Sequence, residues 1–154
     1  MNREIDGLID IHTILSHERK LGGAVEADFI RLNSGEMFQS PVITRIDVTG
    51  GNVYTVSFVD ESGRKFIVHV NEIAVIGSPG HKRIHELNNR YGKQMLTARK
   101  LAYLKRLCEV NAGSSDPFFV KEVIVILDDI GMDAVNEVLH PELLPVIRKT
   151  LSAA

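Results

Sequence analysis

Eight lysine and arginine side chains fall within a stretch of 25 residues that contains one acidic residue, Glu86. Clustered cations of this kind supply most of the sequence-independent affinity for nucleic-acid phosphates, and they suit acidic protein surfaces equally well. Tyr91 and Tyr103 are available to stack on bases, and Asn88 and Asn89 are available to donate to phosphates. The basic residues predicted to bind nucleic acid or an acidic partner are Lys82, Arg83, Arg90, Lys93, Arg99, Lys100, Lys105 and Arg106.

Two simpler interpretations of this basic segment remain open. Its charges could keep an exposed helix solvated, or they could neutralise the chain's own acids, since the residues on both sides of the segment carry more acidic than basic groups. Arg99 and Arg106 are seven residues apart and therefore share one face of a helix. The other basic positions are spread around most of the helix, which weakens the prediction of a single groove-binding stripe.

His81 and His85 have the one-turn spacing that can hold zinc on a helix. Lys82 follows His81 where a metalloprotease motif has glutamate, and the neighbouring cations repel a metal ion. We therefore predict no metal site and interpret both histidines as exposed loop residues.

Cys108 falls on the apolar side of a predicted helix and is expected to be buried and structural.

No catalytic acid pair, triad or phosphate-binding loop is recognisable, so the sequence predicts no catalytic residue and no cofactor. An active site assembled from residues distant in the sequence stays open.

The elements that would position these residues change character along the chain. Residues 4–20 have helical spacing of apolar side chains, ending at Gly22 and Gly23. Residues 42–48, 54–58 and 66–70 alternate as strands do, and glycine-containing turns separate them. Short links between neighbouring strands predict antiparallel pairing. The strand aromatics Tyr54, Phe58 and Phe66 are expected on the inward face, although they are also conceivable base-stacking groups.

The second half is predicted to be helical, after a junction at residues 77–80. Residues 92–110 form the first helix. Asp116 and Pro117 start the second as cap and first turn, and Gly131 ends it. Shorter helices follow at 132–139 and 142–151, separated by His140 and Pro141. Residues 123–127 are apolar nearly all round, which predicts burial on every side, partly by another subunit.

The predicted fold class is therefore α+β: an N-terminal helix, an antiparallel β-meander or small SH3-like barrel, then a C-terminal bundle of three to four helices. The predicted domains are residues 1–78, a β-rich half with the N-terminal helix, and residues 79–154, a helical half, with one shared core as the alternative.

The composition is that of a globular protein, with 44% hydrophobic and 25% charged residues and a net charge of −2. One cysteine excludes an intrachain disulfide, and no long apolar run is present, so a cytoplasmic location without membrane contact is expected. We interpret the protein as a non-catalytic interaction or regulatory protein that self-associates or binds a protein partner. The alternative is a nucleic-acid-binding module that uses residues 82–106.

Overall fold

A computed structural model describes residues 3–111, 114, 116–137 and 143–152 of the chain. It has a mixed α+β fold with antiparallel sheets and six α-helices among the described residues, which confirms the predicted class. Two compact units divide the chain, Met1–Gln94 and Met95–Ala154, and we call them the β unit and the helical unit. The predicted division after residue 78, with one shared core as the alternative, stays a prediction.

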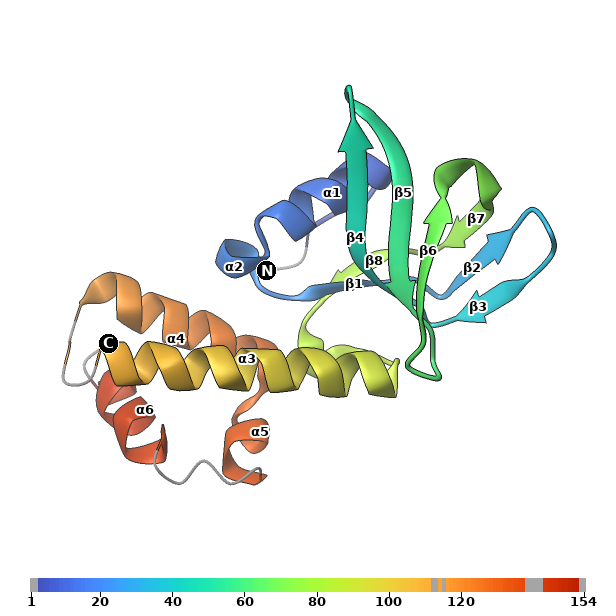
Figure 1. Cartoon of the computed structure of the whole chain (residues 1–154). Coiled ribbons are helices and arrows are strands. Elements are labelled where there is room, and N and C mark those ends of the chain that lie inside the picture. Colours follow the sequence, from blue (N-terminus) through green and yellow to red (C-terminus); the bar gives the residue numbers. More distant parts are fainter. Residues whose placement is uncertain (1–2, 112–113, 115, 138–142, 153–154) are drawn as a thin grey trace. The chain divides into compact units, whose positions relative to one another are not determined.

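The β unit begins with two short helices, α1 (Leu8–Ser16) and α2 (Glu18–Leu21), where the sequence predicts one helix over residues 4–20. The Asp10 carboxylate accepts the backbone N–H groups of Asp6 and Gly7, which satisfies donors at the start of α1. The buried side chains of α1, Ile11 and Ile14, join the core, and α1 contacts β4 and β1 (Figure 1).

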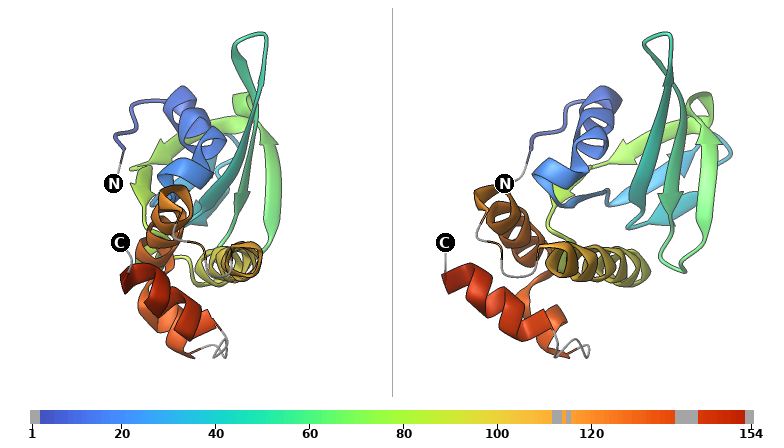
Figure 2. Two further views of the ribbon diagram at one scale, coloured as in Figure 1. Left: turned by 90° about the vertical axis from the view of Figure 1, so that its left-hand side faces the viewer. Right: turned by 60° about the vertical axis from the view of Figure 1, so that its left-hand side comes forward.

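Among the described residues, eight strands form two antiparallel sheets. The five-stranded sheet has the order β6-β5-β4-β1-β8 and the three-stranded sheet the order β3-β2-β7. Their bounds are β1 (Ala24–Glu26), β2 (Phe29–Leu32), β3 (Met37–Gln39), β4 (Val42–Thr49), β5 (Asn52–Val59), β6 (Lys65–His69), β7 (Ile73–Gly77) and β8 (Gly80–Lys82), with 3₁₀ turns η1 (Val70–Glu72) and η2 (Ile84–Glu86). The long β4–β5 hairpin extends beyond the neighbouring strands (Figure 2).

The strands β4, β5 and β6 are consecutive in space and in sequence, as expected for a meander. The strands do not close into a barrel within the described residues, so the predicted SH3-like barrel is wrong. The reason lies at the sheet edges, because β6 and the three-residue β8 each pair with one strand only. The two sheets instead share one core, in which the ring of Phe38 lies 5.0 Å from that of Phe58 and 4.7 Å from that of Phe66.

The helical unit contains most of α3 (Arg90–Val110), which starts in the β unit, and then α4 (Pro117–Ile130), α5 (Met132–Glu137) and α6 (Leu143–Ser152). The carboxylate of Asp116 accepts the N–H of Phe118 at 2.9 Å, and Gly131 follows α4 with φ of 83°, so both predicted ends of this helix are confirmed. The predicted break at His140 and Pro141 lies outside the described residues. Every described helix is too short or too polar to cross a bilayer.

Candidate interaction surfaces

Lys82, the first residue of the basic segment, is directed at an internal acid. Its ammonium group lies 2.9 Å from Oε1 of Glu26, whose side chain is 1% exposed. The Glu26 carboxylate also accepts the backbone N–H groups of Asn88 and Asn89, at 3.1 and 2.8 Å. A buried carboxylate requires such partners, because its desolvation is otherwise very unfavourable. The geometry of Lys82 therefore fits the interpretation that the basic segment neutralises the chain's own acids better than the interpretation of an open cationic surface.

Asn89 is also committed to the interior, and this conflicts with its expected role as a phosphate donor. Its amide nitrogen lies within 2.9–3.1 Å of the carbonyl oxygens of Ser40, Val59 and Asp60. Its amide oxygen accepts the N–H of Gly92 at 2.9 Å, which caps the start of α3. Asparagine shortly before a helical pattern is a known cap signal, and it could have located this residue in the sequence.

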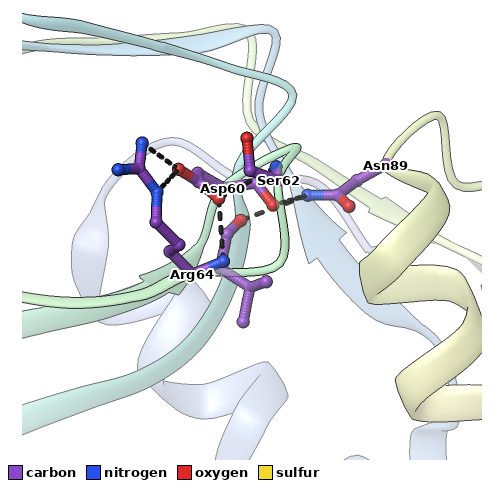
Figure 3. A network of polar contacts seen from close by, with 5 residues as sticks. Asp60, Ser62, Arg64 and Asn89 are labelled. Carbon is purple, nitrogen blue, oxygen red and sulfur yellow. Dashed lines mark hydrogen bonds and ion pairs between the residues drawn. The ribbon is translucent and has the colours of Figure 1, made fainter.

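The carboxylate of Asp60 organises the turn beside Asn89 (Figure 3). It accepts the backbone N–H groups of Ser62 and Arg64 at 2.9 Å, and the guanidinium of Arg64 binds its other oxygen at 3.1 Å. All the hydrogen-bonding contacts drawn in this network join residues of the β unit to one another. The arrangement fixes a turn and the start of a helix.

His81 is buried, with 5% of its surface exposed, so the interpretation as an exposed loop histidine is wrong. Its Nδ1 accepts the N–H of Arg3 at 3.0 Å, and its Nε2 lies 2.8 Å from the carbonyl oxygen of Gly22, which makes Nε2–H the donor. Both ring nitrogens of His81 therefore form hydrogen bonds within the protein. His85 lies in η2, in a separate element, and the described residues contain no cluster of three or more metal-ligating side chains.

The remaining basic residues differ in exposure. Arg83 is half-buried before η2, and Lys93, Lys100 and Lys105 are half-buried on α3. Arg90, Arg99 and Arg106 are exposed on α3. At about 100° per residue, Arg99 and Arg106 share the exposed face of α3, whereas Lys93 and Lys100 form a second pair about 100° away. The segment is therefore not one continuous cationic stripe: Arg99 and Arg106 share one exposed face, and Arg90 is exposed about 180° away from them on the same helix.

The two tyrosines proposed to stack on bases have different surroundings. Tyr91 is 52% exposed at the start of α3, and its ring borders Gly63. Tyr103 is half-buried, and its hydroxyl donates to the carboxylate of Glu122 on α4. Tyr91 alone of the two has an exposed ring.

Cys108 is buried on α3, as predicted, and burial raises the pKa of its thiol above the ordinary value. A protonated, inaccessible thiol is a poor nucleophile. This agrees with a structural role for Cys108.

The outer surface of the β4–β5–β6 hairpins carries a second group of exposed side chains. Ile67 is 74% exposed and Tyr54 is 56% exposed, and the Tyr54 ring contacts that of His69 at 4.8 Å. Asp47 lies on the same sheet, where hydrogen bonds from Thr55 and Arg45 hold the pKa of its carboxyl below the ordinary value. The expected inward position holds for Phe58, which is fully buried, but it is wrong for Tyr54.

The helix α4 has exposed large apolar side chains at two positions. Phe118 is 83% exposed and Ile124 is 40% exposed, so the single chain does not bury α4 on every side, and the predicted cover of residues 123–127 by another subunit stays a prediction. The opposite face is packed against the unit, including α5 and α6. Its buried apolar residues are Phe119, Val120, Val123, Ile126, Leu127 and Ile130. Lys121 and Asp128 are exposed along with Phe118 and Ile124.

No protein-family model, curated protein or solved structure matches this chain.

Proposed function

We propose that this protein is a non-catalytic interaction protein that self-associates through its helical unit. The observation that supports the proposal is the exposure of two large apolar side chains on α4, Phe118 and Ile124. Scattered apolar residues are normal on protein surfaces, but two exposed ones on one helix, with the half-buried Val125 beside them, form an apolar patch of the kind that docking surfaces have. We further propose that the helical unit is the predicted C-terminal bundle of three to four helices. The contacts of α4 with α5 and α6 support this arrangement. A cytoplasmic location is proposed as well.

Self-association is tested by sedimentation velocity over a protein concentration range of about 5 to 500 µM, spanning the affinities of weak interfaces. We expect the weight-average sedimentation coefficient to rise with concentration for the wild type. Phe118→Ser should weaken the association by at least about tenfold, because each of the two copies loses an aromatic anchor worth on the order of 1–2 kcal/mol. A wild type that stays monomeric throughout the range contradicts the proposal.

The matched control for Phe118→Ser is Ile67→Ser, because Ile67 is 74% exposed on the β unit. The control should associate like the wild type. Equal weakening by both substitutions would show a general effect of surface hydrophobicity and would count against α4 as the interface.

A second candidate function is binding of nucleic acid, and it is supported by the shared exposed face of Arg99 and Arg106. Contacts between cations and phosphates release counterions, so binding should weaken steeply as salt rises. We expect Arg99→Glu/Arg106→Glu to abolish any binding of mixed single- and double-stranded DNA and RNA at about 50 mM salt, measured by fluorescence anisotropy.

The control for this pair of substitutions is Lys93→Glu/Lys100→Glu, because these lysines have the same spacing on another side of α3. It changes the net charge equally. If both double variants lose the same affinity, the exposed arginine face is not a specific phosphate surface. If the wild type does not bind at low salt, the nucleic-acid proposal is wrong.

A further inference from the structure

On the exposed face of α4, a cation and an anion lie at equal distances on opposite sides of an apolar centre. We define the α4 outer face as Phe118, Lys121, Ile124, Val125 and Asp128, of which Val125 is half-buried and the others are exposed. The apolar centre lies between Ile124 and Val125. Lys121 precedes Ile124 by three residues, and Asp128 follows Val125 by three residues. The cation and the anion are therefore equally far from the centre, each by about 5 Å along the helix axis.

This arrangement is complementary to a second copy of the same helix in the opposite direction. When the two centres coincide, Lys121 of each copy lies opposite Asp128 of the other. A two-fold interface makes each such contact twice, because the same patch is used on both subunits. Parallel pairing would instead place Lys121 opposite Lys121 and Asp128 opposite Asp128, which is unfavourable.

The same register also provides a position for the most exposed aromatic residue of the chain. Phe118 would lie opposite Gly131, which has no side chain to obstruct the ring and which ends α4 with φ of 83°. Met132 follows and is 39% exposed. A thioether beside an aromatic ring is a favourable contact. The apolar contacts at both ends of the pair therefore agree with the register set by the charges.

We propose that two copies of this chain pair antiparallel through the α4 outer face, with Lys121 of each copy opposite Asp128 of the other. The arrangement rests on the self-association proposed above and specifies its surface and direction. One pair of 14-residue helices buries less than the roughly 1,600 Å² of a standard interface. The dimer is therefore expected to be weak, with a dissociation constant in roughly the micromolar range.

Charge exchange tests the direction of pairing by sedimentation equilibrium. Lys121→Glu places two acids opposite each other at both contacts, and Asp128→Lys does the same with two lysines. Each variant alone should associate about tenfold more weakly than the wild type, since two attractive contacts become repulsive. An equimolar mixture of the two variants should recover the wild-type association, because each mixed contact then joins opposite charges.

The control for the single variants is Lys149→Glu, which makes the same charge change at an exposed lysine of α6. It should associate like the wild type. If the wild type associates but the single variants are unaffected, or the mixture does not recover, antiparallel pairing on α4 is wrong while self-association stands. If the wild type is monomeric at all concentrations, both proposals are wrong.

A crosslinking measurement keeps the test independent of charge and of any folding defect in the charge variants. In a Cys108→Ala background, Ile124→Cys places one thiol near the two-fold axis. We expect rapid formation of a disulfide-linked dimer under mild oxidation, at least tenfold faster than for Lys149→Cys in the same background. Equal rates for the two variants would overturn the proposed pairing.

Discussion

A single amide side chain, that of Asn89, joins three segments of the β unit. Its nitrogen contacts the carbonyl oxygens of Ser40, Val59 and Asp60, and its oxygen caps α3 through the N–H of Gly92. The residue is 1% exposed, so none of these groups can exchange its partner for bulk water without structural change. We infer that Asn89 is a positioning residue for the start of the basic helix.

The contribution of Asn89 can be divided by two substitutions. Asn89→Ala removes both the cap and the amide donor, and we expect it to lower the free energy of unfolding by about 2–4 kcal/mol. Asn89→Asp keeps an oxygen for the cap but replaces the donor with a negative oxygen beside three carbonyls, so it should also be destabilising near neutral pH. Urea denaturation followed by circular dichroism measures both changes.

The control is Asn52→Ala, since Asn52 is an exposed asparagine at the start of β5. It should change the free energy of unfolding by less than about 0.5 kcal/mol. Wild-type stability for Asn89→Ala would show that its hydrogen bonds make no net contribution.

At the scale of the element, the sequence predicts the strands but not which face their side chains occupy. Pairing of β4 with β5 shifts register between Asp47 and Val48, where Val48 faces Val53 and Asp47 faces Thr55. The extra residue on β5 is Tyr54. A bulge reverses the alternation of faces, so Val53 and Val56 both contact the core whereas Tyr54 does not. Strict alternation therefore gives the wrong side for Tyr54.

Local signals are sufficient where one short segment determines the structure. Asp116, Pro117 and Gly131 define both ends of α4 because capping depends on residues adjacent in the sequence. The surroundings of His81 depend instead on Gly22 and Arg3, which are distant in sequence. The same applies to Lys82, whose partner Glu26 lies on another strand. Contacts between residues distant in sequence decide which cations of the basic segment remain accessible. The sequence pattern of that segment alone does not predict these contacts.

At the scale of the whole chain, residues after the sequence-based boundary at residue 78 complete the β unit. The strand β8 pairs with β1, between Val25 and His81 among others. Lys82, Asn88 and Asn89 supply the three contacts of the buried Glu26 carboxylate. A fragment that ends at residue 78 lacks all of these groups, and Glu26 would then have to unfold locally, bind water or become protonated.

We therefore expect a fragment of residues 1–94 to unfold cooperatively in a thermal melt, and a fragment of residues 1–78 to be less stable by several kcal/mol or unfolded. The reason is the loss of β8 together with the partners of a buried charge. Restoring residues 79–89 alone should recover most of the difference, because that extension contains β8, Lys82, Asn88 and Asn89 but lacks the first turn of α3. A fragment of residues 1–78 as stable as residues 1–94 would support the boundary predicted from the sequence and would contradict the anchoring role assigned to Glu26.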